Sequence, residues 1–465
     1  MNSEADTIAR IQALEKKASA VLDAKRKVLS RRPIVIEFSG TPKSGKSSSI
    51  SSLDIFLRRN NFKTKVLTER ASVCPIENKF DPLFNVWNGC AAINQLSEIV
   101  ANRPKEYDVV IMDRGFFDSL CWFEWQKMNG FLGEEDYKRF KSFFTAPRFR
   151  MMVDLVIHFD AMPETSMERE YKNLLTRKQG SVMRDNVLEG YRTSAEAAKQ
   201  WAAPLFRQFV EVKTDDLNQN AVGVKVTELC LEKLQDVAKE KICFVPKDGL
   251  EKLFSGPTAK FSDLEGYFND NMAFDDREIV EDDATKVQLL PIAILKDKRE
   301  FEFVVARKGK TATSKNSPEQ NRILMYFGGH VREEDKTLYD ETEMMGVLHQ
   351  CVFRELKEEL GIDVMLTDKD AVCVWHRDGA RSEQHIAIAF IVERDLDYTK
   401  LNIDDREFVR LTKKEKYGTG ARIDRDGIWD QFDKIDPWSK EVLKSVYGDD
   451  LKYLDRGNDL FSRET

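Results

Sequence analysis

The chain has 465 residues, of which 42% are hydrophobic and 33% are charged, and its formal net charge is −7. This length is too great for one ordinary core and predicts several domains in a globular protein. The acidic balance argues against general nucleic-acid binding, which favours a basic face. It does not exclude phosphate ligands, because local loops bind phosphate whatever the net charge of the chain.

The seven cysteines are scattered and include no CxxC pair, so the sequence predicts neither a zinc site nor a disulfide framework. The opening residues MNSEADTIARIQALEKK contain no apolar stretch of signal-peptide length. No segment reaches the roughly 18 apolar residues that are needed to span a bilayer. We therefore expect a cytoplasmic protein without a membrane partner.

Helical periodicity over residues 5 to 30 predicts an N-terminal helix, and we assign residues 1–32 to it. From 33 to 238, short apolar runs alternate with helical patterns. The runs read IVIEF, TKVLTE, YDVVIMD, DLVIHFDA and QFVEVKT. Strands that alternate with helices predict an α/β domain with a doubly wound parallel sheet.

The pattern changes in the region 242–465. The run ICFVPKDGLEKLF is followed by an acidic stretch, which could be a linker or an arm of the second domain. Further strands are predicted at QLLPIAILKD, EFEFVVARKG, ILMYF, VCVWHRDG and HIAIAFIVE, with a helix near 345–360. This mixture predicts a second domain of the α+β class, with a mixed sheet and helices.

A phosphate-binding loop is predicted directly after the first strand. The sequence carries Gly40-x4-Gly45-Lys46-Ser47, the complete G-x-x-x-x-G-K-[ST] pattern between a strand and a helix. Glycines let backbone N–H groups surround phosphates, and the helix N-terminus adds partial positive charge. Lys46 could reach the β- and γ-phosphates of ATP, and the Ser47 hydroxyl could ligate Mg²⁺. The predicted ATP-binding residues are Gly40, Thr41, Pro42, Lys43, Ser44, Gly45, Lys46, Ser47 and Ser48.

Charged residues also follow the third and fourth predicted strands. Asp113 and Arg114 end the third strand, at the edge where parallel sheets bind ligands. Asp113 could hold Mg²⁺ through water or take the acceptor proton, and Arg114 could clamp an acceptor phosphate. Arg177, Lys178 and Arg184 concentrate positive charge after the fourth strand. They could form a mobile cap over the transferring group, although a solvated helix face explains them about equally well.

The stretch 33–238 resembles the thymidylate kinase and deoxynucleoside kinase group of P-loop kinases. The matching motifs are GTPKSGKSS, LTER, MDRGFFDS, HFDAMPETSMERE and the basic segment after it. The resemblance implies ATP-dependent phosphoryl transfer to a (deoxy)nucleoside or nucleoside monophosphate, with Lys46 as a catalytic residue. It places the acceptor and the transferring phosphate against Glu69, Arg70, Asp113, Arg114, Arg177 and Arg184.

Departures from this family concern the acceptor more than the donor. The chain reads ERASVCP where the family has a glycine or proline turn, and Gly115 displaces the aromatic residue that follows the Asp-Arg pair. Phe84 and Trp87 could stack on a base, although packing in the core explains them better.

A second constellation is the run RELKEELGI at 354–362. On a helix, Glu355, Glu358 and Glu359 are related by i, i+3 and i+4, so their carboxylates share one face. Three like charges need compensation, which a divalent cation with a preference for oxygen ligands supplies. These three glutamates are therefore predicted to bind Mg²⁺, with Mn²⁺ as an alternative.

The same run matches R-E-U-x-E-E-x-G-U, the helical half of the Nudix box, and 242–465 resembles a Nudix branch of predicted phosphoesterases. The resemblance assigns the acidic stretch to this domain. It implies metal-dependent hydrolysis of a nucleoside diphosphate derivative, with Glu355 as a catalytic residue and Arg307 as a phosphate ligand. Gly346 stands where the box has its first glutamate, and Glu341 or Glu343 could substitute. The histidines His330 and His385 could contribute or be structural.

The sequence as a whole predicts a bifunctional nucleotide enzyme, a phosphotransferase fused to a Nudix hydrolase. Its expected partners are ATP and nucleoside or nucleotide substrates, and both families suggest a homodimer. Two alternatives stay open. One domain could bind nucleotide without turnover and act as a sensor, or the kinase could use a non-nucleotide acceptor on the same scaffold.

Overall fold

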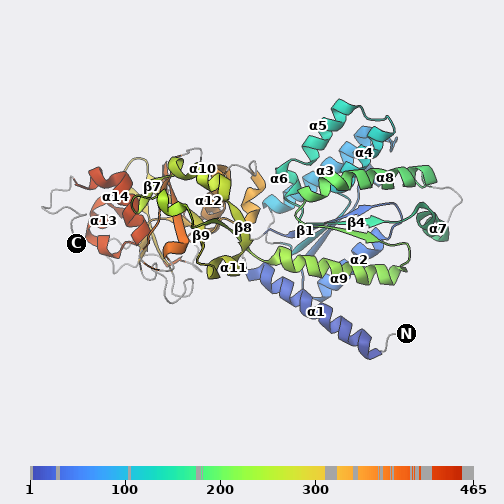
Figure 1. The fold of residues 1–465 in the computed structure, drawn as a ribbon, viewed down its shortest axis with the longest axis horizontal. Coiled ribbons are helices and arrows are strands. Elements are labelled where there is room, and N and C mark those ends of the chain that lie inside the picture. Colours follow the sequence, from blue (N-terminus) through green and yellow to red (C-terminus); the bar gives the residue numbers. More distant parts are fainter. Residues whose placement is uncertain are drawn as a thin grey trace. The chain divides into compact units, whose positions relative to one another are not determined.

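The computed structural model describes residues 4–27, 32–102, 106–173, 180, 182–308, 322–338, 344–364, 366, 370–377, 379, 382–397, 401, 403, 408–409 and 422–452. The chain divides into two compact units, Met1–Glu240 and Lys241–Thr465. Figure 1 shows the helices and strands of both units.

Among the described residues, the first unit has a five-stranded parallel sheet with the order β2-β3-β1-β4-β5. Its strands are β1 (Ile34–Gly40), β2 (Thr64–Leu67), β3 (Val109–Asp113), β4 (Leu155–Asp160) and β5 (Phe209–Lys213). This confirms the parallel sheet that the alternating pattern predicts. Because β1 is central and later strands lie on either side of it, the carboxyl ends of β1 and β3 form a switch point, where α/β sheets bind ligands.

Helices cover both faces of this sheet (Figure 1). The face towards which Ile34, Ile36 and Phe38 point packs against α1 (Glu4–Lys27), α2 (Lys46–Arg59) and α9 (Gln219–Ala238). The face of Val35 packs against α3 (Pro82–Asn102), α4 (Phe116–Met128) and α8 (Asp185–Ala202). Shorter elements are η1 (Ala71–Val73), α5 (Glu134–Phe144), α6 (Pro147–Arg150), α7 (Pro163–Asn173) and η2 (Ala203–Leu205). Strand alternation also turns Glu37 towards α4, and Glu37 is completely buried there.

The N-terminal helix α1 packs against α9 within the first unit. Its residues Ala18, Val21 and Leu22 are buried, and Arg10 forms an ion pair with Glu228 at 2.7 Å. The buried carboxylate of Asp108 lies 3.8 Å from Lys25 and 3.0 Å from Arg26, so the end of α1 is held by charge as well as by apolar contact.

In the second unit the described strands form a mixed sheet with the path β17-β10-β9-β15-β14-β7, to which β13, β6 and β8 are joined. The strands β9 (Lys286–Asp297) and β15 (His385–Arg394) pair in parallel, and the other pairs are antiparallel. The remaining strands are β6 (Lys241–Pro246), β7 (Thr258–Lys260), β8 (Ala273–Asp276), β10 (Glu302–Val304), β13 (Phe327–Gly328), β14 (Val372–Val374) and β17 (Arg422–Asp424). A smaller sheet joins β12 (Ile323–Leu324), β11 (Ala306–Lys308) and β16 (Phe408–Val409).

Two runs that the sequence predicts as single strands are broken. EFEFVVARKG divides at Val305 into β10 and β11, and ILMYF divides into β12 and β13. The halves of each run belong to different sheets. Val305 is fully buried, so the chain changes sheet inside the core, where no polar residue marks the break.

The helices of the second unit are η3 (Leu250–Lys252), α10 (Phe261–Asn271), α11 (Arg277–Asp282), η4 (Glu333–Leu338), α12 (Met344–Leu360), η5 (Ser382–Gln384), α13 (Arg425–Gln431), η6 (Phe432–Lys434) and α14 (Pro437–Lys452). The acidic stretch is structured. It contributes α10, then β8, which pairs with β6, and then α11. The α12 helix packs against β9 and β13 of the mixed sheet.

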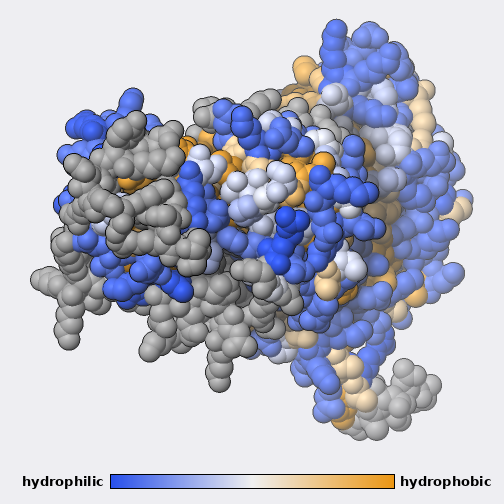
Figure 2. Space-filling view, turned by 60° about the vertical axis from the view of Figure 1, so that its left-hand side comes forward, coloured by the Kyte–Doolittle hydropathy of each residue, from blue (hydrophilic) through white to orange (hydrophobic). Residues whose placement is uncertain are grey.

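All seven cysteines are free thiols. No described helix is both long enough and apolar enough to cross a membrane. Hydrophilic residues cover most of the face seen in Figure 2, and hydrophobic residues are interspersed among them.

Candidate functional site

The loop between β1 and α2 has the backbone shape of a phosphate cradle. The φ angles are positive at Gly40 (131°), Lys43 (59°) and Gly45 (102°), so the peptide groups turn repeatedly within six residues. A Cβ atom at Gly40 would lie 2.0 Å from the carbonyl oxygen of Phe159 on β4, which only glycine avoids. The residues that the sequence predicts for ATP binding therefore lie together at the carboxyl end of the central strand.

Polar groups inside this loop lack the partners that a ligand would supply. Lys46 is only 6% exposed, and its Nζ donates to the carbonyl oxygens of Gly40 and Thr41, both at 2.8 Å. The hydroxyls of Thr41 and Ser44 are buried without a hydrogen-bond partner. Each such group costs about 1–3 kcal/mol. A chain of phosphate oxygens would satisfy them, and Ser47 is exposed at the first turn of α2, so the loop fits a nucleotide with its Mg²⁺.

The environment of Lys46 also affects its charge. Burial and the nearby charge of Arg114 lower the pKa of Lys46 to about 8, although Asp118 and Asp113 act in the opposite direction. An ammonium group that is desolvated and close to losing its proton gains most from an arriving anion.

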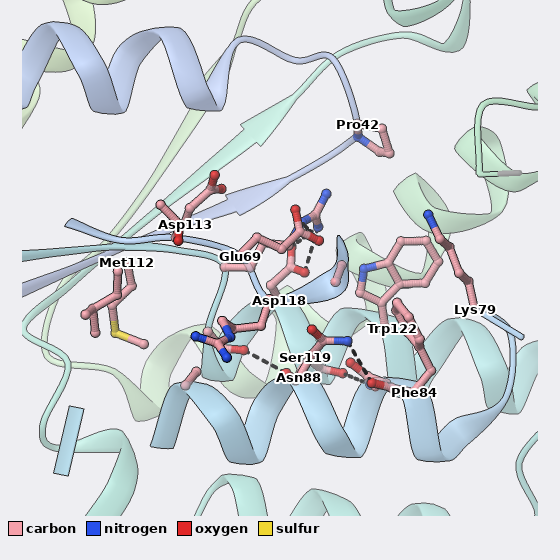
Figure 3. Close-up of a pocket in the computed structure, with 18 of the residues that line it drawn as sticks. Pro42, Glu69, Lys79, Phe84, Asn88, Met112, Asp113, Asp118, Ser119 and Trp122 are labelled. Carbon is pink, nitrogen blue, oxygen red and sulfur yellow. Dashed lines mark hydrogen bonds and ion pairs between the residues drawn. The ribbon is translucent and has the colours of Figure 1, made fainter. Parts of the chain in front are cut away.

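A pocket of about 110 Å³ opens beside this loop (Figure 3). One water needs about 10–15 Å³ on this measure, so the pocket has room for a ligand of many atoms. Its lining includes Pro42 of the loop, Glu69 and Arg70 after β2, Asp113 and Arg114 after β3, and Phe84, Asn88 and Trp122 from α3 and α4. In Figure 3, Trp122 and Phe84 lie towards one side of the pocket and Asp113 towards the other.

Arg114 is the best-fixed charge in the pocket. Its φ angle of 67° is rare for a residue with a side chain and costs about 1–3 kcal/mol. Its N–H donates to Phe38 O at 2.9 Å, and its guanidinium pairs with Asp118 at 2.7 Å and with Glu69 at 3.1 Å. Burial opposes the charge, but the two carboxylates outweigh it and raise the pKa of Arg114 well above its usual value.

Asp113 lies between the loop and the pocket. Burial raises its pKa, although the positive charges of Lys46 and Arg114 act in the opposite direction. A carboxylate so placed suits both roles that the sequence leaves open, a water-mediated contact to Mg²⁺ and the acceptance of a proton.

The buried Glu37 explains the unexpected glycine after the Asp-Arg pair. Its carboxylate accepts the N–H groups of Phe117 and Asp118 at 3.1 and 2.9 Å, in the first turn of α4. A Cβ atom at Gly115 would lie 2.9 Å from Glu37 Cδ. A larger residue at Gly115 would push this carboxylate away from the helix end. Burial raises the pKa of Glu37 to about 7 despite these hydrogen bonds.

The structure brings together most, but not all, of the predicted kinase residues. Arg177 lies outside the described residues. Arg184 is exposed at the N-cap of α8, whereas Val182 just before it lines the pocket. Phe84 lines the pocket and Trp87 is not part of its lining.

Several residues around the site were not singled out from the sequence. Asp118 pairs with Arg114 at i,i+4 spacing, a signal that was present in MDRGFFDS. Arg169 of α7 donates to the Lys43 carbonyl at 3.3 Å and to the Thr214 carbonyl at 2.6 Å. Glu170 pairs with Lys43 Nζ at 2.9 Å. The α7 helix therefore holds the middle of the phosphate loop, which no local spacing shows.

In the second unit, the glutamates of α12 face the Gly328–Gly329 turn. Gly328 N donates to Glu359 Oε2 at 3.0 Å, and a Cβ atom at Gly329 would lie 2.7 Å from Glu355 Oε1. Glu355 and Glu359 are 7% and 4% exposed, while Glu358 is more open. Gly329 is needed because the Glu355 carboxylate lies directly against it, and Gly328 is needed because a Cβ atom there would lie 2.3 Å from Pro291 O.

Arg354 is held by a carboxylate that the sequence did not indicate. Asp335 of η4 is buried and accepts Arg354 Nε and Nη2, both at 2.8 Å. Arg354 in turn lies 2.5 Å from Glu355 and 3.6 Å from Glu358. The expected substitutes Glu341 and Glu343 lie outside the described residues. The carboxylate that pairs with Arg354 thus comes from Asp335, outside the helix.

The donors for a metal ion are present on α12 but do not converge. Among the described residues, no three His, Cys, Asp or Glu side chains are close enough to hold an ion together. Glu355 and Glu358 face Arg354, and Glu359 accepts a backbone N–H. The oxygen chemistry suits Mg²⁺ or Mn²⁺, but this arrangement of the side chains does not fit one.

The other predicted residues of this unit lie nearby or on another sheet. His330 Nε2 is 2.8 Å from Gln288 Oε1, and the His330 and His385 rings are 6.2 Å apart. Arg307 lies on β11 in the smaller sheet, and its role stays a prediction.

No protein-family model and no curated protein matches the sequence. Solved structures do. Deoxyadenosine kinase from M. mycoides with bound dCTP is 16% identical, covering 43% of this chain and 99% of that chain, with a TM-score of 0.33. The same kinase with the products dCMP and a flexible dCDP bound is 17% identical, covering 44% of this chain and 100% of that chain, with a TM-score of 0.34. Tm1382, a proposed Nudix hydrolase, is 20% identical, covering 44% of this chain and 100% of that chain, with a TM-score of 0.32. Similarities this weak carry no argument about activity.

The raised pKa of Glu37 predicts a pH effect on stability. The native protein keeps the Glu37 proton up to about pH 7, whereas the unfolded chain releases it near 4.5. The unfolded state therefore binds fewer protons in this window, and the contribution of Glu37 falls as pH rises through it, by about 3 kcal/mol in all. Glu37→Gln should remove this slope.

Urea unfolding of the first unit at pH 5 and pH 8 checks this for both proteins. The comparison must be between variants, because burial lowers the pKa of His158 to about 4 and gives an opposite slope below 6.5. A free-energy difference between wild type and Glu37→Gln that does not change with pH would contradict the assignment.

Proposed function

We propose that the first unit transfers a phosphoryl group from ATP·Mg²⁺ to a hydroxyl group of a nucleoside. One observation carries the proposal. The loop at 40–47 holds a buried lysine and unpaired buried hydroxyls directly beside a pocket with fixed charges. Phe84, Trp122 and Asn88 give that pocket two aromatic faces and an amide, which suit a planar base.

The charges in the pocket favour an uncharged acceptor over a monophosphate. Arg114 is already paired with Glu69 and Asp118, and Asp113 adds a third carboxylate. A phosphate dianion would have to displace a carboxylate from Arg114 and would meet the others at close range. A neutral hydroxyl adds no charge and leaves the buried Arg114–Asp118 pair in place. Glu69, whose side chain is 39% exposed, is free to turn towards it as a proton acceptor.

The residues of the loop then act in defined ways. Lys46 would exchange the Gly40 and Thr41 carbonyls for phosphate oxygens, and the loop N–H groups would hold the β-phosphate. Ser47 and Asp113 would hold Mg²⁺, which neutralises charge on the phosphate oxygens when it is bound. Arg177 and Arg184 keep their proposed role as a cap over the transferring group.

Substitution of Lys46 tests the donor site. Lys46→Ala should lower kcat by about 10²–10³-fold, the usual effect of removing one preorganised donor at developing charge. Wild-type affinity for MgATP should weaken about tenfold between pH 7 and pH 9, because free Lys46 loses its proton near pH 8. Lys46→Arg should abolish that pH dependence.

Calorimetric titration with MgATP and a coupled ATPase assay measure both effects. The exposed Lys65 on β2 provides a matched control, since Lys65→Ala removes the same charge away from the loop. Unchanged turnover in Lys46→Ala would rule out phosphoryl transfer at this loop.

An acceptor panel tests the substrate class. Nucleosides should be phosphorylated, and their 5′-monophosphates should be poorer acceptors because they add negative charge beside Glu69, Asp113 and Asp118. Transfer of labelled γ-phosphate to each panel member measures this. Phosphorylation of monophosphates alone would show that Arg114 does exchange its partners, and transfer only to sugars or other small alcohols would favour a non-nucleotide acceptor.

For the second unit we propose metal-dependent hydrolysis of a diphosphate bond in a nucleoside diphosphate derivative. Support comes from Glu355, Glu358 and Glu359, which share one face of α12, and from the contacts of Glu355 and Glu359 with the Gly328–Gly329 turn. Metal binding would require Glu355 and Glu358 to turn away from Arg354. The alternative, a binding domain without turnover, is favoured by the hold of Arg354 on these carboxylates.

Manganese binding separates these two readings. Glu358→Gln should lose Mn²⁺ affinity, followed by electron paramagnetic resonance, and phosphate release from a nucleoside-diphosphate panel should fall at least about tenfold. Asp363→Asn is the matched control, because Asp363 is an exposed carboxylate just beyond the same helix. Nucleotide binding without Mn²⁺ binding or phosphate release would support the sensor.

A further inference from the structure

We propose that Asp118 is a positioning residue that couples the phosphate loop to the acceptor pocket, and that Tyr191 of α8 holds Asp118 in place. The inference rests on the proposed kinase function of the first unit. It adds a physical link between the donor and acceptor sites, and it assigns a role to two side chains that do not contact the transferred group.

The carboxylate of Asp118 has donors from three separate parts of the fold. Arg114 Nη1 donates to Oδ2 at 2.7 Å and to Oδ1 at 2.8 Å. Gly40 N, at the start of the phosphate loop, donates to Oδ1 at 3.2 Å. The Tyr191 hydroxyl donates to the same oxygen at 2.8 Å. One carboxylate therefore joins the loop after β1, the turn after β3 and the helix α8.

Asp118 is ionised although it is only 2% exposed. Burial acts to raise its pKa, but the charges of Arg114 and Lys46 outweigh burial and lower it. A buried ion pair of this kind adds little stability over an apolar pair of similar shape. The pair therefore has its main effect on geometry. It fixes the direction of an arginine whose backbone is already in an unusual conformation.

Tyr191 connects this carboxylate to the wall of the pocket. Its side chain is fully buried, and its ring lies 4.7 Å from the ring of Trp122, which lines the acceptor pocket. Burial and the neighbouring charge of Asp118 raise the pKa of Tyr191 well above its usual value, so its hydroxyl remains a proton donor. A shift of α8 relative to α4 would thus move Asp118 and, through it, Arg114.

Loss of the carboxylate should disturb the reaction more than the fold. In Asp118→Asn, Arg114 keeps Glu69 as a partner, but that side chain is 39% exposed and fixes the guanidinium less well. We expect kcat/KM for the acceptor to fall about 100-fold, as is typical for a misplacement of about 1 Å at a reacting group. Tyr191→Phe removes one neutral hydrogen bond, and about a fivefold fall is expected. KM for MgATP should change less than about threefold in Tyr191→Phe, which leaves the Asp118 charge in place.

The chain offers a matched control in Tyr137. It is also a buried tyrosine that donates to a buried carboxylate, that of Glu124, and Tyr137 lies outside the pocket lining. Tyr137→Phe should lower the thermal unfolding temperature and leave kcat and both KM values unchanged. A purely structural role for Asp118 and Tyr191 would give their variants this same pattern and would overturn the proposal.

A second measurement does not depend on turnover. Phenylglyoxal modifies accessible arginines, and peptide mass spectrometry gives the rate at Arg114. This rate should rise at least about fivefold in Asp118→Asn and should stay at the wild-type value in Tyr137→Phe. If wild type phosphorylates no acceptor, the proposed kinase function fails, and the labelling rate still decides the positioning role. An unchanged rate at Arg114 would overturn it. If Asp118→Asn does not fold, Tyr191→Phe carries both measurements.

Discussion

The charges at the carboxyl ends of β1 and β3 must be balanced almost without water. Lys46 and Arg114 are both largely buried, and the carboxylates of Asp113 and Asp118 interact with both. The two acids act to raise the pKa of Lys46, and the two cations act to lower the pKa of both acids, so each charge favours the others. Two further buried groups hold this arrangement in place. Glu37 accepts the first N–H groups of α4, and the Tyr191 hydroxyl donates to Asp118.

The sheet supplies this arrangement through simple alternation. Apolar side chains of β1 pack into the hydrophobic cores on both faces of the sheet. On the α4 side, Glu37 occupies one of these buried positions. Glu37 binds the first N–H groups of α4, so the helix that carries Asp118 is tied to the strand that carries the phosphate loop. Gly115 is the price of that contact, because no Cβ fits between the two. A departure from the expected family pattern is thus a packing requirement, and it leaves the position of Asp113 and Arg114 intact.

Sequence reasoning reaches the groups that lie within one element. The loop at 40–47 and the glutamates of α12 were found because their spacing alone places the groups together, and the parallel sheet followed from alternation. The partners from distant elements were missed. Tyr191 is far from Asp118 along the chain, and Asp335 reaches Arg354 from η4. The division of EFEFVVARKG at Val305 was also hidden, because a buried valine looks the same in the middle of a strand and at a change of sheet.

In both units, an arginine pairs with carboxylates that lie close together. In the first unit, Arg114 lies between Glu69 and Asp118, and the proposed uncharged acceptor would leave the buried pair with Asp118 intact. In the second unit, Arg354 lies between Asp335 and the glutamates of α12, and there the arginine occupies the face that a cation would use. The difference would follow from the two proposed reactions. The proposed hydroxyl acceptor would need its arginine held still, whereas the proposed metal ion would need its carboxylates released. Asp335 can hold Arg354 on its own through two hydrogen bonds, so the glutamates could leave that arginine without burying an unpaired charge.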